Sequence, residues 1–185
     1  MSIAKTDLIS YKEFLTKSKK PSVRPAIWKG KDIEKALNDS LSDSFMGDGR
    51  GAVSLINKDT GDKYGVSPNV NALVQVLAPG EHNNPHRHSN MAIFFVFQGE
   101  GYSIIEGEKI EWEKGDVFFS PAWLAHEHCN TSDTENAILY TIQDVPTVSG
   151  MGAWFLEEPL GTGAKHVVEG SAEEKDILPE ARITR

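Results

Sequence analysis

The sequence predicts an all-β fold, a sandwich or barrel of short strands with helical additions at both ends of the chain. The chain has 185 residues, a length typical of one domain that buries a sizeable core. From Gly51 to about Ala153, apolar runs of four to six residues alternate with segments rich in Gly, Asn and Asp. Runs of this length, separated by turn residues at close intervals, are typical of strands rather than helices.

Six apolar runs are the expected strands of this body. They cover 52–57, 72–77, 93–97, 102–105, 116–120 and 137–142. We expect one domain over 1–185, with a barrel core at about 51–157, an N-terminal extension over 1–50 and a C-terminal loop and helix over 158–185. The short helix candidates are 10–15, 31–39 and 171–185, the last of them interrupted at Pro179.

The composition narrows the classes of function. The net charge of −8 argues against non-specific nucleic-acid binding, which needs a basic surface. No apolar run approaches the ~20 residues that span a bilayer, and the first residues lack the charged-then-apolar order of a secretory signal. The single cysteine, Cys129, cannot form an internal disulfide, and we interpret it as a small buried thiol. We therefore expect a cytoplasmic protein that binds neither nucleic acid nor a membrane.

Five of the six histidines lie in two clusters, His82, His86 and His88, then His126 and His128. Imidazole is the commonest protein ligand for a transition metal. Two residues on one strand separated by one position share a face, so His86 and His88 are expected side by side. A third imidazole from a neighbouring strand, His126, would complete a site with positions open to water, substrate or O2. The alternative is a pair of surface histidines beside a core histidine.

Both clusters stand in a frame of Gly and Pro residues. Residues 80–99 read GEHNNPHRHSNMAIFFVFQG, and residues 115–130 read GDVFFSPAWLAHEHCN. These segments resemble the two signature motifs of the cupins, separated here by a short spacer over 100–114. The resemblance is strong over the motifs and looser from Gln75 to Pro159. It implies a jelly-roll barrel, a double-stranded β-helix, and a homodimer, because cupins commonly pair through strand exchange at the sheet edge.

The chain also resembles a narrower group within the cupins. The runs HRHSNMAIFFVFQGEG, SPAWLAHEHCN and QDVPTVSGMGAWFLEEP are similar to gentisate 1,2-dioxygenases and their relatives that act on salicylate and hydroxynaphthoate. The resemblance implies that His86, His88 and His126 hold Fe(II). It also implies a non-haem dioxygenase that uses O2 on a small aromatic hydroxy compound. The general cupin motif has a glutamate where this chain has Ala92, and the dioxygenase group lacks that glutamate as well. Trp123 replaces a motif glycine.

Two further residues match positions of the dioxygenase group. His128 stands where the group has a histidine that contacts the substrate or the oxygen intermediate, and it could act in proton transfer. Its alternative role is to fix a loop beside the metal. Gln75 matches a glutamine before the first motif, and its amide needs a partner if it is buried. A bound substrate and a backbone carbonyl are equally good partners.

The expected substrate pocket is apolar and aromatic. Its lining residues are Phe94, Val96, Phe119, Trp123 and Tyr140. In our alignment the dioxygenase group has an arginine at the position of Phe94, where it would bind a substrate carboxylate, and an acidic residue near Thr141.

The loss of that arginine keeps two other classes open. One is a cupin lyase, isomerase or decarboxylase that uses Zn, Ni or Mn as a Lewis acid. The other is a metal-bound sensor of small molecules without turnover. His166 is expected to lie exposed in a loop, and His82 is expected to have no direct role.

Overall fold

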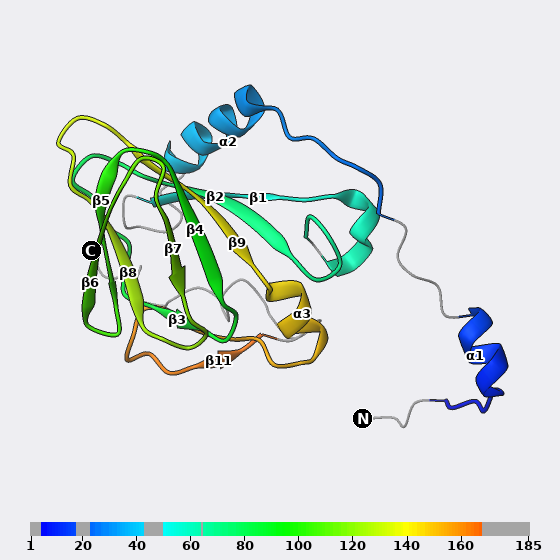
Figure 1. Ribbon diagram of the computed structural model, residues 1–185. Coiled ribbons are helices and arrows are strands. Elements are labelled where there is room, and N and C mark those ends of the chain that lie inside the picture. Colours follow the sequence, from blue (N-terminus) through cyan, green and yellow to red (C-terminus); the bar gives the residue numbers. More distant parts are fainter. Residues whose placement is uncertain (1–4, 18–22, 43–49, 64, 168–185) are drawn as a thin grey trace.

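The computed structural model describes residues 5–17, 23–42, 50–63 and 65–167. Within them the body is a set of antiparallel strands, with a helix against one side and a short helix at one end (Figure 1). The predicted all-β fold is confirmed, and so are the two N-terminal helices. The predicted C-terminal helix over 171–185 lies outside the described residues.

The helices are α1 (Tyr11–Lys17), α2 (Gly30–Ser42), α3 (Val145–Gly150) and the 3₁₀-helix η1 (Lys58–Lys63). The strands are β1 (Arg50–Leu55), β2 (Asn71–Leu77), β3 (Arg87–His88), β4 (Ala92–Gln98), β5 (Glu100–Ile105), β6 (Glu108–Glu113), β7 (Val117–Ser120), β8 (His126–Asn130), β9 (Ala137–Gln143), β10 (Phe155–Glu157) and β11 (Lys165–His166).

Three sheets form the body, with strand orders β1-β2-β9-β4-β7, β6-β5-β8 and β11-β10-β3. Side chains alternate strictly on β4, where Ala92, Phe94 and Val96 are buried and the residues between them are exposed. This period of two is the strand signature that the sequence shows. The buried residues of β4 join inward side chains of β2, β5, β6, β7 and β9 in one apolar core.

The first histidine pair and the apolar run after it lie on separate strands. His88 ends β3, and the apolar run belongs to β4, which begins at Ala92. The bend between them is held from outside: Ser89 N–H donates to the carbonyl oxygen of Phe155 (3.0 Å), and Met91 N–H donates to Oδ1 of Asp144 (2.9 Å). As a result β3 pairs with β10, and β4 pairs with β7 and β9.

Helix α2 covers half of the outer face of the five-stranded sheet. Its Leu37 is buried against Val74 and Val76 of β2, and a cluster of further apolar side chains surrounds them. The amphipathic pattern of α2 therefore packs on β1 and β2. Most of its contacts with the sheet fall on these two strands, Ile138 and Tyr140 of β9 join the same apolar cluster, and the outer side of β4 and β7 is left exposed.

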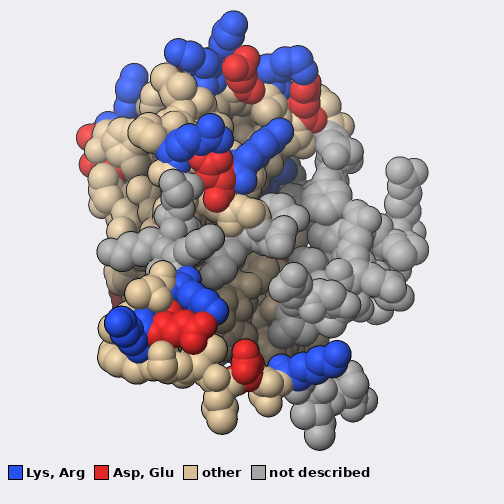
Figure 2. All heavy atoms as spheres, turned by 90° about the vertical axis from the view of Figure 1, so that its right-hand side faces the viewer, with Lys and Arg blue, Asp and Glu red and all other residues tan. Residues whose placement is uncertain are grey.

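Charges of both signs are mixed on the surface. On the face shown in Figure 2, Lys and Arg side chains lie beside Asp and Glu side chains in small groups, with uncharged residues between them. The described residues of that face therefore form no continuous basic surface of the kind that binds nucleic acid. Among the described residues, no helix has the length and apolar character needed to cross a membrane.

Candidate metal centre

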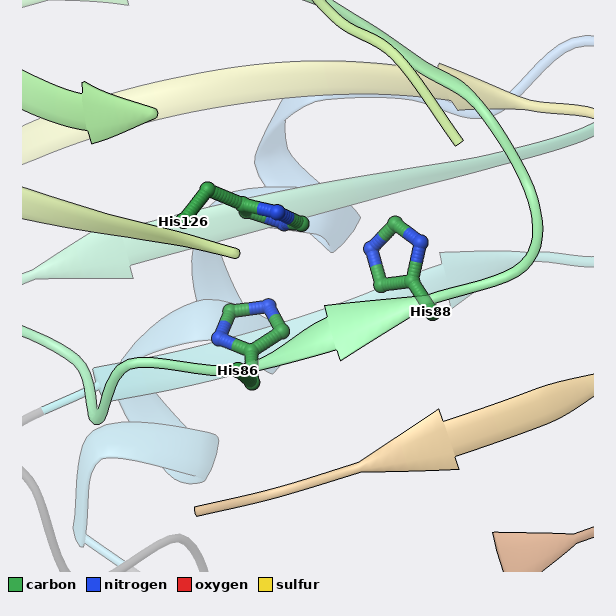
Figure 3. A group of neighbouring side chains, drawn as sticks. All are labelled: His86, His88 and His126. Atoms are coloured by element: carbon green, nitrogen blue, oxygen red, sulfur yellow. The ribbon is translucent and has the colours of Figure 1, made fainter. Parts of the chain in front are cut away.

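Three histidines converge inside the barrel (Figure 3). His88 ends β3, His126 begins β8, and His86 directly precedes β3. His86 and His126 exchange backbone hydrogen bonds of 3.0 and 2.8 Å, which fixes the register of the two segments. One nitrogen of each ring lies within 4.8 Å of the others. The three are the only group of three or more potential metal ligands in the part of the chain that the structure describes.

The outer nitrogen of each ring binds a backbone carbonyl. Nδ1 lies 2.8 Å from the Asn84 oxygen in His86, 2.8 Å from the Asn90 oxygen in His88 and 2.9 Å from the Leu124 oxygen in His126. A carbonyl oxygen only accepts, so Nδ1 carries the proton and Nε2 keeps its lone pair in His88 and His126. In His86 the side-chain nitrogen of Asn83 also lies 3.1 Å from Nδ1, and the shorter contact with the Asn84 oxygen favours the same tautomer. Protein metal sites commonly orient ligating histidines in this way.

Burial keeps these rings neutral. Removal from water lowers the pKa of His88 and lowers that of His86 well below its usual range, with smaller contributions to His86 from neighbouring positive groups. The same loss of hydration lowers the pKa of His126 to about 4. Neutral imidazole is the form that binds metal. The buried Nε2 of His126 has no hydrogen-bond partner among the described residues, as expected for an atom that binds an ion.

Ala92 lies at the position of the missing glutamate. It is fully buried on β4, opposite Ser120 on one side and Gln143 on the other. A methyl group contributes no ligand, so the three imidazoles are a neutral set. A neutral set of three ligands suits a metal that also binds an anionic substrate.

His128 follows His126 on the same face of β8 and is also buried, but its hydrogen bonding is reversed. Its Nδ1 lies 2.7 Å from the hydroxyl of Ser103, which accepts a hydrogen bond of 2.9 Å from the Trp112 indole. Among the described residues, Nδ1 is the only acceptor available to the buried Ser103 proton. Ser103 therefore donates to Nδ1, and the proton of the His128 ring is on Nε2. Loss of hydration lowers the pKa of His128 well below its usual range, so the ring is a neutral N–H donor.

The partner of the Gln75 amide is a side-chain hydroxyl, neither a substrate nor a backbone carbonyl. Its side-chain nitrogen donates to the hydroxyl of Thr141 at 3.1 Å, and both residues are buried on the inner side of the sheet. Thr141 lies near the position at which the resemblance implied an acidic residue. The two polar groups thus satisfy each other within an apolar wall.

The five residues expected to line the substrate pocket do not all lie on the inner face of the barrel. Phe94 and Val96 face inward, and the Phe94 ring stacks on Phe118 (4.7 Å between centroids) and meets His128 edge-on (4.6 Å). Trp123 is half-buried with a backbone φ of 67°, and its N–H donates to the carbonyl oxygen of His88 at 2.7 Å. The Trp123 ring lies under the Arg87 guanidinium.

Phe119 and Tyr140 do not lie inside the barrel, and this corrects the prediction. On β7 the inward positions are Phe118 and Ser120, so Phe119 points out and is 52% exposed. Tyr140 packs on the outer side of the sheet, where its ring meets Phe97 at 5.5 Å. Aromatic character suggested a pocket for both residues, but strand parity decides which face each one occupies.

Arg50 is a candidate site residue that sequence reasoning missed. It is only 8% exposed at the start of β1 and forms an ion pair with Glu158 at 2.5 Å. Burial is the main cause of the lowered pKa of His86, His126 and His128, and the positive charge of Arg50 makes a smaller contribution to each. The sequence offered one indication, an arginine just ahead of a strand. Because the expected strand began at residue 52, Arg50 was not counted as part of it, whereas β1 begins at Arg50 itself.

The remaining titratable candidates lie outside the site. His82 is exposed, with Nδ1 3.2 Å from the Asn83 oxygen, and His166 is exposed on β11. Nε2 of His166 donates to the Gly152 oxygen at 2.7 Å. Cys129 is partly buried beside Tyr102, and burial raises the pKa of its thiol.

Comparison with known proteins places the chain among named relatives. The model of the cupin domain family matches residues 73–143. A 5-nitrosalicylic acid 1,2-dioxygenase from a Bradyrhizobium species is 31% identical over 169 residues, which cover 89% of this chain and 81% of the relative. A gentisate 1,2-dioxygenase from a Streptomyces species is 32% identical over 143 residues, which cover 76% of this chain and 40% of the relative.

A solved structure shares the fold. The crystal structure of a salicylate 1,2-dioxygenase from Pseudaminobacter salicylatoxidans superposes with a TM-score of 0.62 and 22% identity, covering 70% of this chain and 38% of that chain. The fold and the three histidines together define a cupin with a site for a metal ion. The chain belongs to the cupin family of gentisate- and salicylate-type 1,2-dioxygenases. It spans most of the Bradyrhizobium relative and less than half of the Streptomyces one.

Proposed function

We propose that this protein is a non-haem Fe(II) dioxygenase that opens the ring of a small hydroxyaromatic acid with O2. The observation that carries the proposal is the trio of neutral, carbonyl-oriented histidines in a chain of this family. His86, His88 and His126 would hold the iron. When bound, the iron would supply a redox-active Lewis acid at which substrate oxygens and O2 meet.

Arg50 is the residue that we propose for recognition of the substrate carboxylate. Phe94 stacks in the core and has no charge to offer, whereas Arg50 is buried and its charge acts on His86 and His126. A guanidinium has five N–H donors and binds carboxylate through a fork. The ion pair with Glu158 orients the Arg50 side chain. The residue that binds the substrate carboxylate would thus lie on β1 and not at the position of Phe94 on β4.

His128 would hold a proton at the reacting oxygens. Its Nε2–H is fixed by Ser103 and its ring is neutral, so it can donate a hydrogen bond without an added charge. Gln75 and Thr141 would add polar contacts on the opposite wall. Phe94 and Val96 would line the apolar side of the site and exclude water, which strengthens the charged contacts within it. Trp123 lies under Arg87, away from the face of β3 that carries the histidines.

Location and assembly complete the proposal. A cytoplasmic location is supported by the single cysteine of the chain. We propose a homodimer that acts on a small molecule and O2 and binds neither nucleic acid nor a membrane. The net charge of −8 and the mixed surface charges support the exclusion of nucleic-acid binding.

The test is O2 consumption by protein that is purified anaerobically and loaded with one metal at a time. We expect uptake with the Fe(II) form and a hydroxyaromatic acid such as gentisate or salicylate, and none with the Zn form. His126→Ala should abolish uptake together with bound iron, while the matched control His166→Ala changes an exposed histidine and should keep both. No uptake with any hydroxyaromatic substrate, from a fully loaded Fe(II) protein, would contradict the proposal and point to the Lewis-acid class.

A further inference from the structure

A group of large apolar side chains is exposed on the outer side of the five-stranded sheet. The group comprises Ile93 (37% exposed), Phe95 (42%), Phe97 (48%), Val117 (65%), Phe119 (52%) and Ile142 (47%). We call these six residues the exposed apolar face. They lie on β4, β7 and β9, beside the part of the sheet that α2 covers.

The residues of the exposed apolar face are contiguous. Ile93 is paired with Phe119 on one side and with Ile142 on the other, and Phe95 is paired with Val117 in the same way. Cross-strand neighbours on one face of a sheet have touching side chains. An open groove of ≈ 530 Å³ runs along the face and is lined by Phe95, Phe97, Ile142 and their apolar neighbours.

The face also lacks charge. The outward positions of β4, β7 and β9 hold only Ile, Phe, Val and Tyr, whereas the chain as a whole has a net charge of −8. Edges and faces of sheets that stay in water usually carry charged residues that prevent association. Single exposed apolar residues need no explanation, but a contiguous patch of this kind marks an interaction site.

We infer that the exposed apolar face binds the same face of a second copy of this chain. Six half-exposed side chains of this size offer roughly 500 Å² per copy. A pair would bury about 1,000 Å², which is near the lower limit for a specific interface. An uncharged patch that meets itself leaves no charge unpaired, whereas a charged partner would bury unmatched groups. A twofold axis makes such a contact self-complementary.

The inferred contact differs from pairing at a sheet edge. It uses side chains of β4 and β9, which lie inside the sheet order, and it requires no backbone hydrogen bonds between copies. It is also independent of the proposed reaction, because Ile142 and Phe95 point away from the barrel interior.

Sedimentation velocity of the full chain tests the inference across a concentration series from 1 to about 100 μM. We expect a monomer–dimer equilibrium in the wild-type protein. Ile142→Asp and Phe95→Asp should each raise the dimer dissociation constant at least ~100-fold, because each places an unpaired carboxylate in the contact. The matched control is Met151→Asp, which changes a 68% exposed apolar residue at the end of α3 and should leave the dissociation constant unchanged.

Three outcomes would overturn the inference. The first is a wild-type chain that remains monomeric at the highest concentration. The second is a dimer that survives both substitutions and Leu15→Asp, which would assign the contact to a sheet edge. The third is a dimer that survives both substitutions but is lost in Leu15→Asp, which would assign the contact to the exposed apolar side of α1, where Leu15 is 56% exposed. Circular dichroism and the metal content of each variant show that it is folded, so a monomeric variant reports on the contact itself.

Discussion

The position of a single proton distinguishes the four buried histidines. In His86, His88 and His126 a carbonyl accepts from Nδ1, which leaves Nε2 free to bind a metal. In His128 the hydroxyl of Ser103 donates to Nδ1, which leaves a proton on Nε2. The residue type is the same in all four cases, and the hydrogen-bond partner decides whether the ring acts as a ligand or as a donor.

Ser103→Ala should therefore reduce turnover without removing the metal. Loss of the hydroxyl frees the His128 ring to adopt the other tautomer, and we expect kcat to fall by roughly 10- to 100-fold. Nitrogen NMR of the imidazole should show a shift toward the Nδ1–H form, and iron content should stay at the wild-type level. Trp112→Phe removes only the indole donor to Ser103 and should have a smaller effect. An unchanged tautomer in Ser103→Ala would exclude this role for the hydroxyl.

Arg50 can be tested by the charge of the substrate. Arg50→Gln alone would leave the Glu158 carboxylate buried, so we pair it with Glu158→Gln to keep the site neutral. The double variant should raise KM for gentisate by at least ~10-fold and leave KM for an uncharged hydroquinone nearly unchanged. Anaerobic titration calorimetry of the Fe(II) protein measures the same difference as binding. Equal losses for both compounds would indicate a general structural role for Arg50.

The buried histidines also make the stability of the metal-free protein depend on pH. The pKa of His126 is about 4 in the folded protein and about 6.5 when unfolded. Between these values the unfolded chain binds more protons, so stability is greatest above pH 6.5 and declines as the pH falls toward 4. His126 alone should account for roughly 3 kcal/mol of this decline. Urea unfolding across this range should show a shallower decline in His126→Gln, and a wild-type free energy that is independent of pH would contradict the assignment.

At the scale of elements, six of the strands were predictable from the sequence, whereas the pairing of the strands was not. Apolar runs bounded by Gly, Asn and Asp located six strands, because strand length and turn chemistry are local properties. Strand β6 was not predicted, because its sequence EKIEWE is mostly charged and contains only two apolar residues, one of them the buried Trp112. The division between β3 and β4 depends on Asp144 and Phe155, more than 50 positions further along the chain, so no local pattern could reveal it.

Gly101 lies on β5, where this strand closely approaches β8 and the Trp112 ring of β6. A Cβ atom at this position would lie 2.0 Å from the Cys129 carbonyl oxygen and 2.5 Å from the Trp112 ring. Gly101→Ala should force β5 and β8 apart and lower the free energy of unfolding by about 1–3 kcal/mol. Gly30→Ala at the start of α2 meets no atom within 4 Å and should be nearly neutral. Denaturant unfolding compares the two, and a stable Gly101→Ala would mean that the strands yield without cost.

At the scale of the whole molecule, the sequence predicted the metal ligands better than their surroundings. Motif spacing located His86, His88 and His126 because a strand places alternate residues on one face. Aromatic character alone predicted a pocket position for Phe119 and Tyr140, but strand alternation places both on the outer face. Arg50 comes close to the site only through the pairing of β1 with β2, which depends on the whole sheet.

The metal centre joins separate parts of this architecture, and its effect on stability should be large. His88 belongs to the sheet of β3 and β10, whereas His126 belongs to the sheet of β5 and β8, so one ion would cross-link two sheets. Binding only to the folded state at 100 times the dissociation constant adds about 2.7 kcal/mol, which for a chain of this size raises Tm by roughly 5–10 °C. Zn²⁺ allows the measurement in air by calorimetry. We expect the rise in wild type and in His166→Ala, and its loss in His86→Ala, because two imidazoles hold the ion far more weakly than three. A rise that persists in His86→Ala would show that the ion binds elsewhere.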